Sequence, residues 1–148
     1  MPLNDTIGSV LEAKSRIVWS VAPGTTVFDA LSLMADHDIG AILVQDGDRL
    51  CGVLSERDYA RKVILSGKSS RDTQVEEIMS EPDVVTRSTT VDECMRDMTA
   101  TRVRHMPVVE NGRVLGVVSI GDLVNWVISV QERTINDLHA YVAGSYPG

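Results

Sequence analysis

The chain has 148 residues, 43% hydrophobic and 24% charged, a composition typical of a globular protein with one good core and unlike collagen, a disordered tail or a disulfide scaffold. Asp and Glu outnumber Lys and Arg by 21 to 14, and the net charge of -7 makes a nucleic acid an unfavourable partner. Residues 1–10 do not resemble a signal peptide, and no apolar run approaches the roughly 20 residues of a membrane helix, so we expect a cytoplasmic protein without a membrane partner. Cys51 and Cys94 lack C-x-x-C spacing, which favours a reducing compartment.

An internal repeat is the most prominent feature of the sequence. When the chain is shifted by 64 residues, residues 21–64 align with residues 85–128 without a gap. The identical pairs are Val21/Val85, Thr25/Thr89, Thr26/Thr90, Val27/Val91, Met34/Met98, Val44/Val108, Arg49/Arg113, Gly52/Gly116, Val53/Val117, Ser55/Ser119, Asp58/Asp122, Val63/Val127 and Ile64/Ile128. Residues 66–73 are polar and contain glycine and serine, so we expect them to link the two copies.

Each copy predicts the same elements in the order β-α-β-β-α. A strand near residues 17–21 opens the first copy. The next helix has a capping-box start, Thr26-x-x-Asp29, which recurs as Thr90-x-x-Glu93. A hairpin of two apolar strands follows, and a last helix begins after Ser55 and after Ser119. The expected hairpin strands are residues 41–44 and 50–54 with a turn at 46–49, and residues 106–109 and 114–118 with a turn at 110–113.

These elements indicate an α+β fold built from two repeated units. A unit of about 60 residues buries too little surface to be stable by itself, so we expect the two to pack about a pseudo-twofold axis with a cleft between them. The last helix runs on through Trp126, Ile135 and Leu138, which are more apolar residues than one unit needs. This excess predicts a second copy of the chain as a packing partner, in a homodimer.

The candidate site is a repeated heptapeptide at the junction of a strand and a helix, residues 52–58 (GVLSERD) and residues 116–122 (GVVSIGD). Free backbone N–H groups and the positive end of the helix dipole favour a phosphate there, and a carboxylate in the first helical turn can accept from both hydroxyls of a ribose. The alternative is structural. Ser-x-x-Asp is also a helix-cap pattern, in which the acid stabilises the helix by about 0.3–1 kcal/mol.

The two Gly-hydrophobic-hydrophobic-Ser-x-x-Asp motifs, a Pro-Val-Val strand and a Thr-Val helix start resemble a tandem pair of cystathionine-β-synthase (CBS) domains. Residues 102–109 are similar to the entry strand of the second domain in stand-alone bacterial proteins. On this resemblance the first domain is expected at residues 10–67, the second at 75–131 and a helical extension and tail at 132–148. The resemblance implies that AMP, ADP, ATP, NAD(H) or S-adenosylmethionine binds in the cleft between the domains.

Residue by residue, the resemblance implies that Asp58 and Asp122 bind ribose hydroxyls. It also implies that Ser55 and Ser119 lie near the ribose or a phosphate. Arg57, beside Asp58 in the first motif, has the uncharged Gly121 as its counterpart in the second, so we expect cations from both copies to hold one phosphate.

Further cations complete the expected site. Arg104 and His105 match positions that face ligand phosphates in some members of the family, whereas the first copy has Gly40 and Ala41 there. The two sites are therefore not expected to be equivalent. The charged pair Lys14 and Arg16, ahead of the first strand, either closes over a phosphate or stays solvated.

Three hypotheses for function follow. The first is a sensor, not an enzyme, in which an adenine nucleotide stabilises one arrangement of the two domains and an unknown protein target responds. The second is a purely structural interaction module without a nucleotide. The third is an enzyme acting on a nucleotide, for which the sequence offers no activated nucleophile. His37 and His139 lack metal-ligand spacing, so no metal site is expected.

Overall fold

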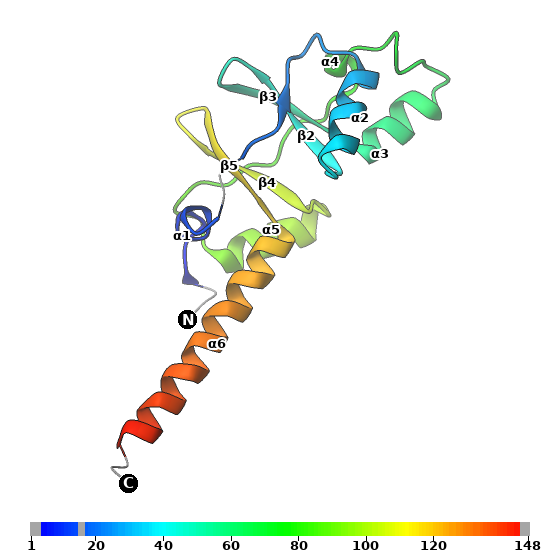
Figure 1. Ribbon diagram of the computed structural model, residues 1–148. Helices are drawn as coiled ribbons and strands as arrows, with labels where there is room; N and C mark the ends of the chain where they lie inside the picture. Colours follow the sequence, from blue (N-terminus) through cyan, green and yellow to red (C-terminus); the bar gives the residue numbers. More distant parts are fainter. Residues whose placement is uncertain (1–3, 15–16, 146–148) are drawn as a thin grey trace.

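The computed structural model describes residues 4–14 and 17–145. Figure 1 shows two halves, one around the β2–β3 hairpin and one around the β4–β5 hairpin, with a long last helix that projects from the second half. No helix in the described ranges is long and apolar enough to cross a membrane. The elements are α1 (Ile7–Glu12), β1 (Ser20–Val21), α2 (Val27–Asp36), β2 (Ala41–Asp46), β3 (Arg49–Ser55), α3 (Glu56–Tyr59), the π-helical turn η2 (Ala60–Ile64), α4 (Val75–Ile78), α5 (Val91–Thr101), β4 (His105–Glu110), β5 (Arg113–Ser119) and α6 (Ile120–Ser145).

The strands form one sheet in the order β1-β2-β3-β5-β4. The two hairpins have the same register: Ala41 pairs with Ser55 in the first and His105 with Ser119 in the second. The hairpins meet at one bridge, between Arg49 and Arg113, which are equivalent residues of the repeat. When two equivalent residues pair antiparallel with each other, a twofold axis passes between them. The expected α+β fold with two related units is therefore confirmed.

The strand that opens each unit is shorter than expected. In the first unit only Ser20 and Val21 pair with β2 as a strand, and Lys14, ahead of them, lies against the second unit, where its Nζ donates to the Val117 carbonyl. In the second unit the strand is reduced to a single bridge between Val85 and Val108, and Pro82 ahead of it has no N–H to donate.

The helix that follows each opening strand begins where the sequence predicted. Thr26 caps α2 by accepting from the backbone N–H of Asp29 at 3.2 Å, and Thr90 caps α5 in the same way through Glu93 at 3.1 Å. The buried faces of these helices pack on their own hairpins, and they consist of Val27, Ala30 and Met34 in α2 and Val91, Cys94 and Met98 in α5.

Each core is completed by a short helix that precedes the other unit. Helix α1 packs into the core of the second unit through Ile7, Val10 and Leu11, and α4 packs into the core of the first unit through Val75 and Ile78. Equivalent backbone hydrogen bonds of 2.8 Å hold both, from Val91 N–H to the Asp5 carbonyl and from Val27 N–H to the Thr73 carbonyl. The repeat at a shift of 64 residues does not predict this exchange, because the two helices are related by a shift of 68 residues.

Candidate functional site

A cavity of about 790 Å³ lies between the two units. Both strand–helix junctions open into it, together with the segments that lead from α1 to β1 and from α4 to the second unit. Arg16 lies outside the described residues. The cavity is lined by every other residue that the sequence singled out: Lys14, Ser55, Arg57, Asp58, Arg104, His105, Ser119 and Asp122.

Both junctions are closed by a reciprocal helix cap. Ser55 Oγ accepts from the backbone N–H of Asp58 at 3.1 Å, and Asp58 Oδ2 accepts from the backbone N–H of Ser55 at 3.0 Å. The corresponding distances between Ser119 and Asp122 are 3.0 and 2.8 Å. The structural interpretation of Ser-x-x-Asp therefore accounts for part of what each aspartate does, and any ligand must use what the cap leaves free.

The Asp58 carboxylate is surrounded by donors. Besides the Ser55 cap, Oδ1 accepts from Ser80 Oγ at 2.6 Å and lies 3.2 Å from Lys62 Nζ, and the side chain is only 8% exposed. Burial alone would raise the pKa of Asp58, but the hydrogen bonds from Ser80, Ser55 and Lys62 outweigh it and hold the pKa below its usual value. Asp58 is thus a charged, fully hydrogen-bonded group.

The Asp122 carboxylate is more open. Its Oδ2 accepts from the Ser119 N–H and from Lys14 Nζ at 2.5 Å, whereas Oδ1 accepts no hydrogen bond from the residues that the structure describes. The side chain is 27% exposed. Burial again works to raise the pKa of Asp122, and the Lys14 and Ser119 hydrogen bonds lower it overall.

Cations gather beside Asp122. His105 is the first residue of β4 and pairs across the hairpin with Ser119. Partial burial of its ring lowers the pKa of His105; Asp122 opposes this effect, while Lys14 and Arg104 add to it. The lowered pKa keeps the His105 ring neutral near pH 7, where it can still donate a hydrogen bond, so Lys14 and Arg104 supply the positive charge for an anion in this part of the cavity.

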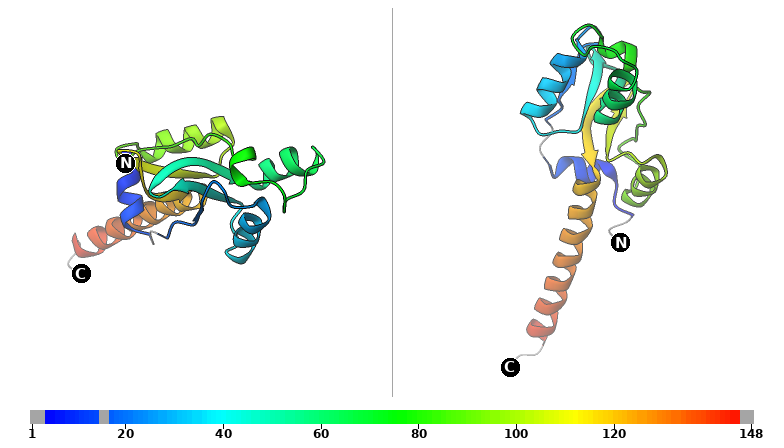
Figure 2. Two further views of the ribbon diagram at one scale, coloured as in Figure 1. Left: turned by 90° about the horizontal axis from the view of Figure 1, so that it is seen from above. Right: turned by 90° about the vertical axis from the view of Figure 1, so that its right-hand side faces the viewer.

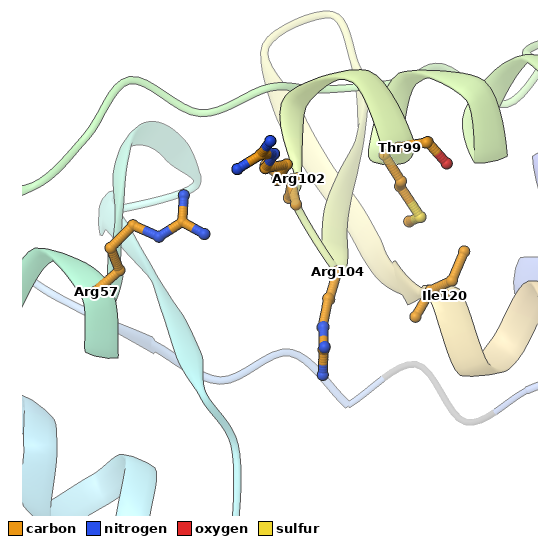
Figure 3. Close-up of a pocket in the computed structure, with 7 residues that line it drawn as sticks. Arg57, Thr99, Arg102, Arg104 and Ile120 are labelled. Atoms are coloured by element: carbon orange, nitrogen blue, oxygen red, sulfur yellow. The ribbon is translucent and has the colours of Figure 1, made fainter.

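A second cavity of about 510 Å³ adjoins the first and shares Arg57, Arg102 and Arg104 with it. In Figure 3, Arg57 extends from the start of α3 toward the segment that carries Arg102 and Arg104. Within residues 4–14 and 17–145 none of the three guanidinium groups forms an ion pair. Three unpaired arginines from both units around one space favour a phosphate or another anion.

Several residues at the site were not predicted from the sequence. Ser80 lies outside the aligned repeat and left no signal, whereas Lys62 stands four residues after Asp58 on a predicted helix and could have been recognised as its partner. Trp19 lines the cavity and stacks on His37, with ring centroids 3.5 Å apart and an angle of 17° between the planes. An aromatic face at the wall of the cavity offers a contact surface for a flat base.

This duplicated arrangement matches a known family. A family model of the CBS domain matches residues 8–64 and again residues 75–129. The chain belongs to the CBS domain family. Its two units are therefore a CBS pair, and the resemblance seen in the repeated motifs is confirmed.

Similar proteins support this assignment. The chain is 38% identical to the "CBS domain-containing protein CBSX3, mitochondrial" of Arabidopsis thaliana over 95% of this chain and 73% of that protein. A solved structure from Burkholderia ambifaria, provisionally described as a signal-transduction protein with CBS domains, is 48% identical, has a TM-score of 0.78 and covers 84% of this chain and 94% of its own. The structure of CBSX2 in complex with AMP is 26% identical, with a TM-score of 0.70 over 82% of this chain and 97% of that one.

Proposed function

We propose that this CBS pair binds an adenine nucleotide in the cavity between its units and acts as a regulatory sensor without catalytic activity. The observation that carries the proposal is the combination, in one cavity of about 790 Å³, of a capped carboxylate for ribose hydroxyls and of arginines that form no ion pair with the residues the structure describes and can bind a phosphate. CBSX2, a structural relative, was crystallised with AMP, and this makes AMP the first candidate. ADP, ATP, NAD(H) and S-adenosylmethionine share the adenosine group and are the further candidates.

The cavity provides for each part of such a ligand. A carboxylate accepts from ribose hydroxyls, and the guanidinium groups of Arg57, Arg102 and Arg104 neutralise a phosphate. Ile17 and Trp19, both exposed at the cavity wall, offer apolar surface to the base. A ligand held by both units at once stabilises one relative orientation of the units, to the extent that it binds this orientation more tightly than others. Binding is thereby converted into a signal that a protein partner recognises.

The long helix α6 supports the second part of the proposal, self-association into a homodimer. Figure 2 shows that α6 leaves the body of the molecule, and all side chains from Gln131 to His139 are exposed. Ile128, Ile135 and Leu138 are 47%, 54% and 61% exposed and follow spacings of seven and three residues, as in the seam of a coiled coil. An isolated helical extension of this length is marginal in water, so it needs a partner.

A structural module without a nucleotide is the rival function, and the same exposed stripe on α6 favours it. The two functions differ in their response to ligands. For the compartment we propose the cytoplasm, as expected from the sequence. The related CBSX3 carries the word mitochondrial in its name.

Thermal unfolding of the full chain with AMP, ADP, ATP, NAD, NADH and S-adenosylmethionine tests the proposal, with GMP and inorganic phosphate as controls. A ligand present at 100 times its dissociation constant adds about 2.7 kcal/mol, which raises the melting temperature by roughly 5–10 °C for a chain of this length. A rise with one adenine ligand, smaller with GMP and absent with phosphate, is the expected result. An unchanged melting temperature across the panel at millimolar ligand would contradict nucleotide binding and favour the structural module.

A further inference from the structure

We infer that the two halves of the cavity have different roles: a single anionic adenine nucleotide binds per chain, at Asp122, whereas Asp58 is a structural carboxylate that holds the cavity wall together. This inference rests on the proposed function and deepens it. Both aspartates occupy equivalent positions of the repeat, so the difference must come from their surroundings.

The free hydrogen-bonding capacity of the two carboxylates differs. Both oxygens of Asp58 are occupied, Oδ1 by Ser80 and Lys62 and Oδ2 by the Ser55 backbone and hydroxyl. At Asp122 all hydrogen bonds from the described residues go to Oδ2. Since a ribose hydroxyl needs an open acceptor, Asp122 Oδ1 can receive it without the loss of an existing bond.

The lysine beside each aspartate shows the same difference. An ammonium group has three hydrogens to donate. Lys62 Nζ uses all three, on the Ile78 carbonyl at 2.9 Å, on Ser80 Oγ at 3.2 Å and on Asp58. Among the described residues Lys14 Nζ has two acceptors, the Val117 carbonyl at 2.7 Å and Asp122 at 2.5 Å, which leaves one hydrogen for a phosphate oxygen.

The charges around the two aspartates favour an anion on the Asp122 side. Arg104 and His105 line the cavity together with Asp122, and Arg104 and Lys14 both act on the His105 ring, whereas the equivalent residues of the first unit are Gly40 and Ala41. Gly40 is the equivalent of Arg104, and a Cβ on Gly40 would be 3.9 Å from the carboxylate carbon of Glu56. The first unit therefore has an acidic group close to the position at which the second unit has an arginine. Glu81, which also lines the cavity, directly follows Ser80 and adds a further negative charge on the Asp58 side. On the Asp58 side Lys62 is already paired with the carboxylate, and Arg57 extends away toward Arg102 and Arg104 (Figure 3). The free positive charge therefore lies toward the second unit, and a phosphate is favoured on the Asp122 side.

Isothermal titration of the full chain with AMP and with adenosine tests this inference, in the wild type and in Asp122→Asn and Asp58→Asn. We expect one AMP per chain. Loss of the charged acceptor in Asp122→Asn weakens AMP binding by about tenfold or more, as is typical for a charge-assisted hydrogen bond. Asp58→Asn lowers the melting temperature and keeps the AMP affinity of the wild type.

The two lysines provide a matched pair that does not alter either carboxylate. Lys14→Met is expected to weaken AMP binding about fivefold or more and to leave the affinity for adenosine within about twofold, because adenosine lacks the phosphate. Lys62→Met removes the same charge on the Asp58 side and leaves the AMP affinity unchanged.

The outcomes separate this inference from the proposed function. Two AMP molecules per chain, or loss of binding in Asp58→Asn and Lys62→Met but not in Asp122→Asn and Lys14→Met, would overturn the assignment to Asp122 while nucleotide binding stands. If the wild type binds neither AMP nor any other adenine nucleotide, the proposed function fails together with the inference.

Discussion

Met79 lies so close over Gly52 that a Cβ at position 52 would be 2.6 Å from its sulfur. The equivalent contact in the second unit joins Leu11 and Gly116, where a Cβ would be 2.5 Å from Leu11 Cδ1. Met79 directly follows α4 and Leu11 belongs to α1, the two helices that the units exchange. The same contact in both units explains why glycine opens both heptapeptide motifs. The lack of a Cβ lets the exchanged segment approach the sheet.

Substitution of either glycine by alanine is expected to reduce stability. In Gly52→Ala the new methyl group meets the Met79 side chain and also the Ser80 carbonyl oxygen at 3.1 Å, so the Met79 side chain must move and the backbone at Ser80 must give slightly. The expected loss in the free energy of unfolding is about 1–3 kcal/mol, the usual cost of overpacking. Urea denaturation measures it, with Gly24→Ala as the control, since nothing lies within 4 Å of a Cβ there. Equal stability of Gly52→Ala and Gly24→Ala would show that the segment is not fixed on the sheet.

Acid should destabilise the protein through its two junction aspartates. The pKa values of Asp58 and Asp122 are both lowered in the folded chain, so their ionised forms stabilise it at pH values above the unfolded aspartate pKa of about 3.9. This stabilisation is lost as the pH falls through the lower folded pKa values. We expect the free energy of unfolding to fall below about pH 4, and to fall less steeply in Asp58→Asn. Urea titrations between pH 7 and pH 3 measure both slopes, and parallel curves for the two proteins would contradict the expectation.

The two cysteines should differ in reactivity. Cys94 is fully buried in α5, and burial together with the nearby Asp97 raises the pKa of its thiol to about 11. Cys51 is only half-buried. Because the thiolate is the reactive form, iodoacetamide at pH 8 should modify Cys51 alone in the native protein and both cysteines in urea. Mass spectrometry of Cys51→Ala provides the control, since modification of this variant under native conditions would mean that the α5 core opens.

Self-association should depend on the exposed stripe of α6. Introduction of two lysines by Ile135→Lys and Leu138→Lys places charges into the proposed seam and should convert a dimer into a monomer, measured as mass by light scattering after gel filtration. The variant Ser129→Lys with Asn136→Lys adds the same charge at exposed positions on another face of the helix and should remain dimeric. A monomeric wild type at all accessible concentrations would leave α6 available for a different partner.

The repeat explains why much of the fold was predictable from the sequence. Helix starts at Thr26 and Thr90 and both hairpins follow from local patterns, and each pattern was supported by its copy. The candidate residues converge on one cavity because the twofold arrangement brings the two junctions, ending in Asp58 and Asp122, to the same side of the sheet.

The contacts that distinguish the two junctions were not predictable. Lys14 reaches Asp122 across 108 residues of sequence, and no local pattern encodes such a contact. The same holds for Ser80 and Asp58, because Ser80 lies between the aligned copies. The exchanged helix α1 was missed for a related reason: its partner α4 matches it only at a different shift of the sequence.

The exchange of α1 and α4 has a consequence for the order of folding. During synthesis α1 leaves the ribosome first, yet Ile7 and Leu11 have no core to enter until residues 85–123 have followed, so the second unit closes by a contact between distant parts of the chain. A cut within residues 66–73 would leave α1 on one fragment and the core that it completes on the other, while α4 would be separated from the first unit. Neither fragment then contains all the residues of one core, whereas a mixture of the two fragments contains the residues of both cores. The halves of this protein are therefore expected to fold by complementation when combined, and to remain incomplete when expressed singly.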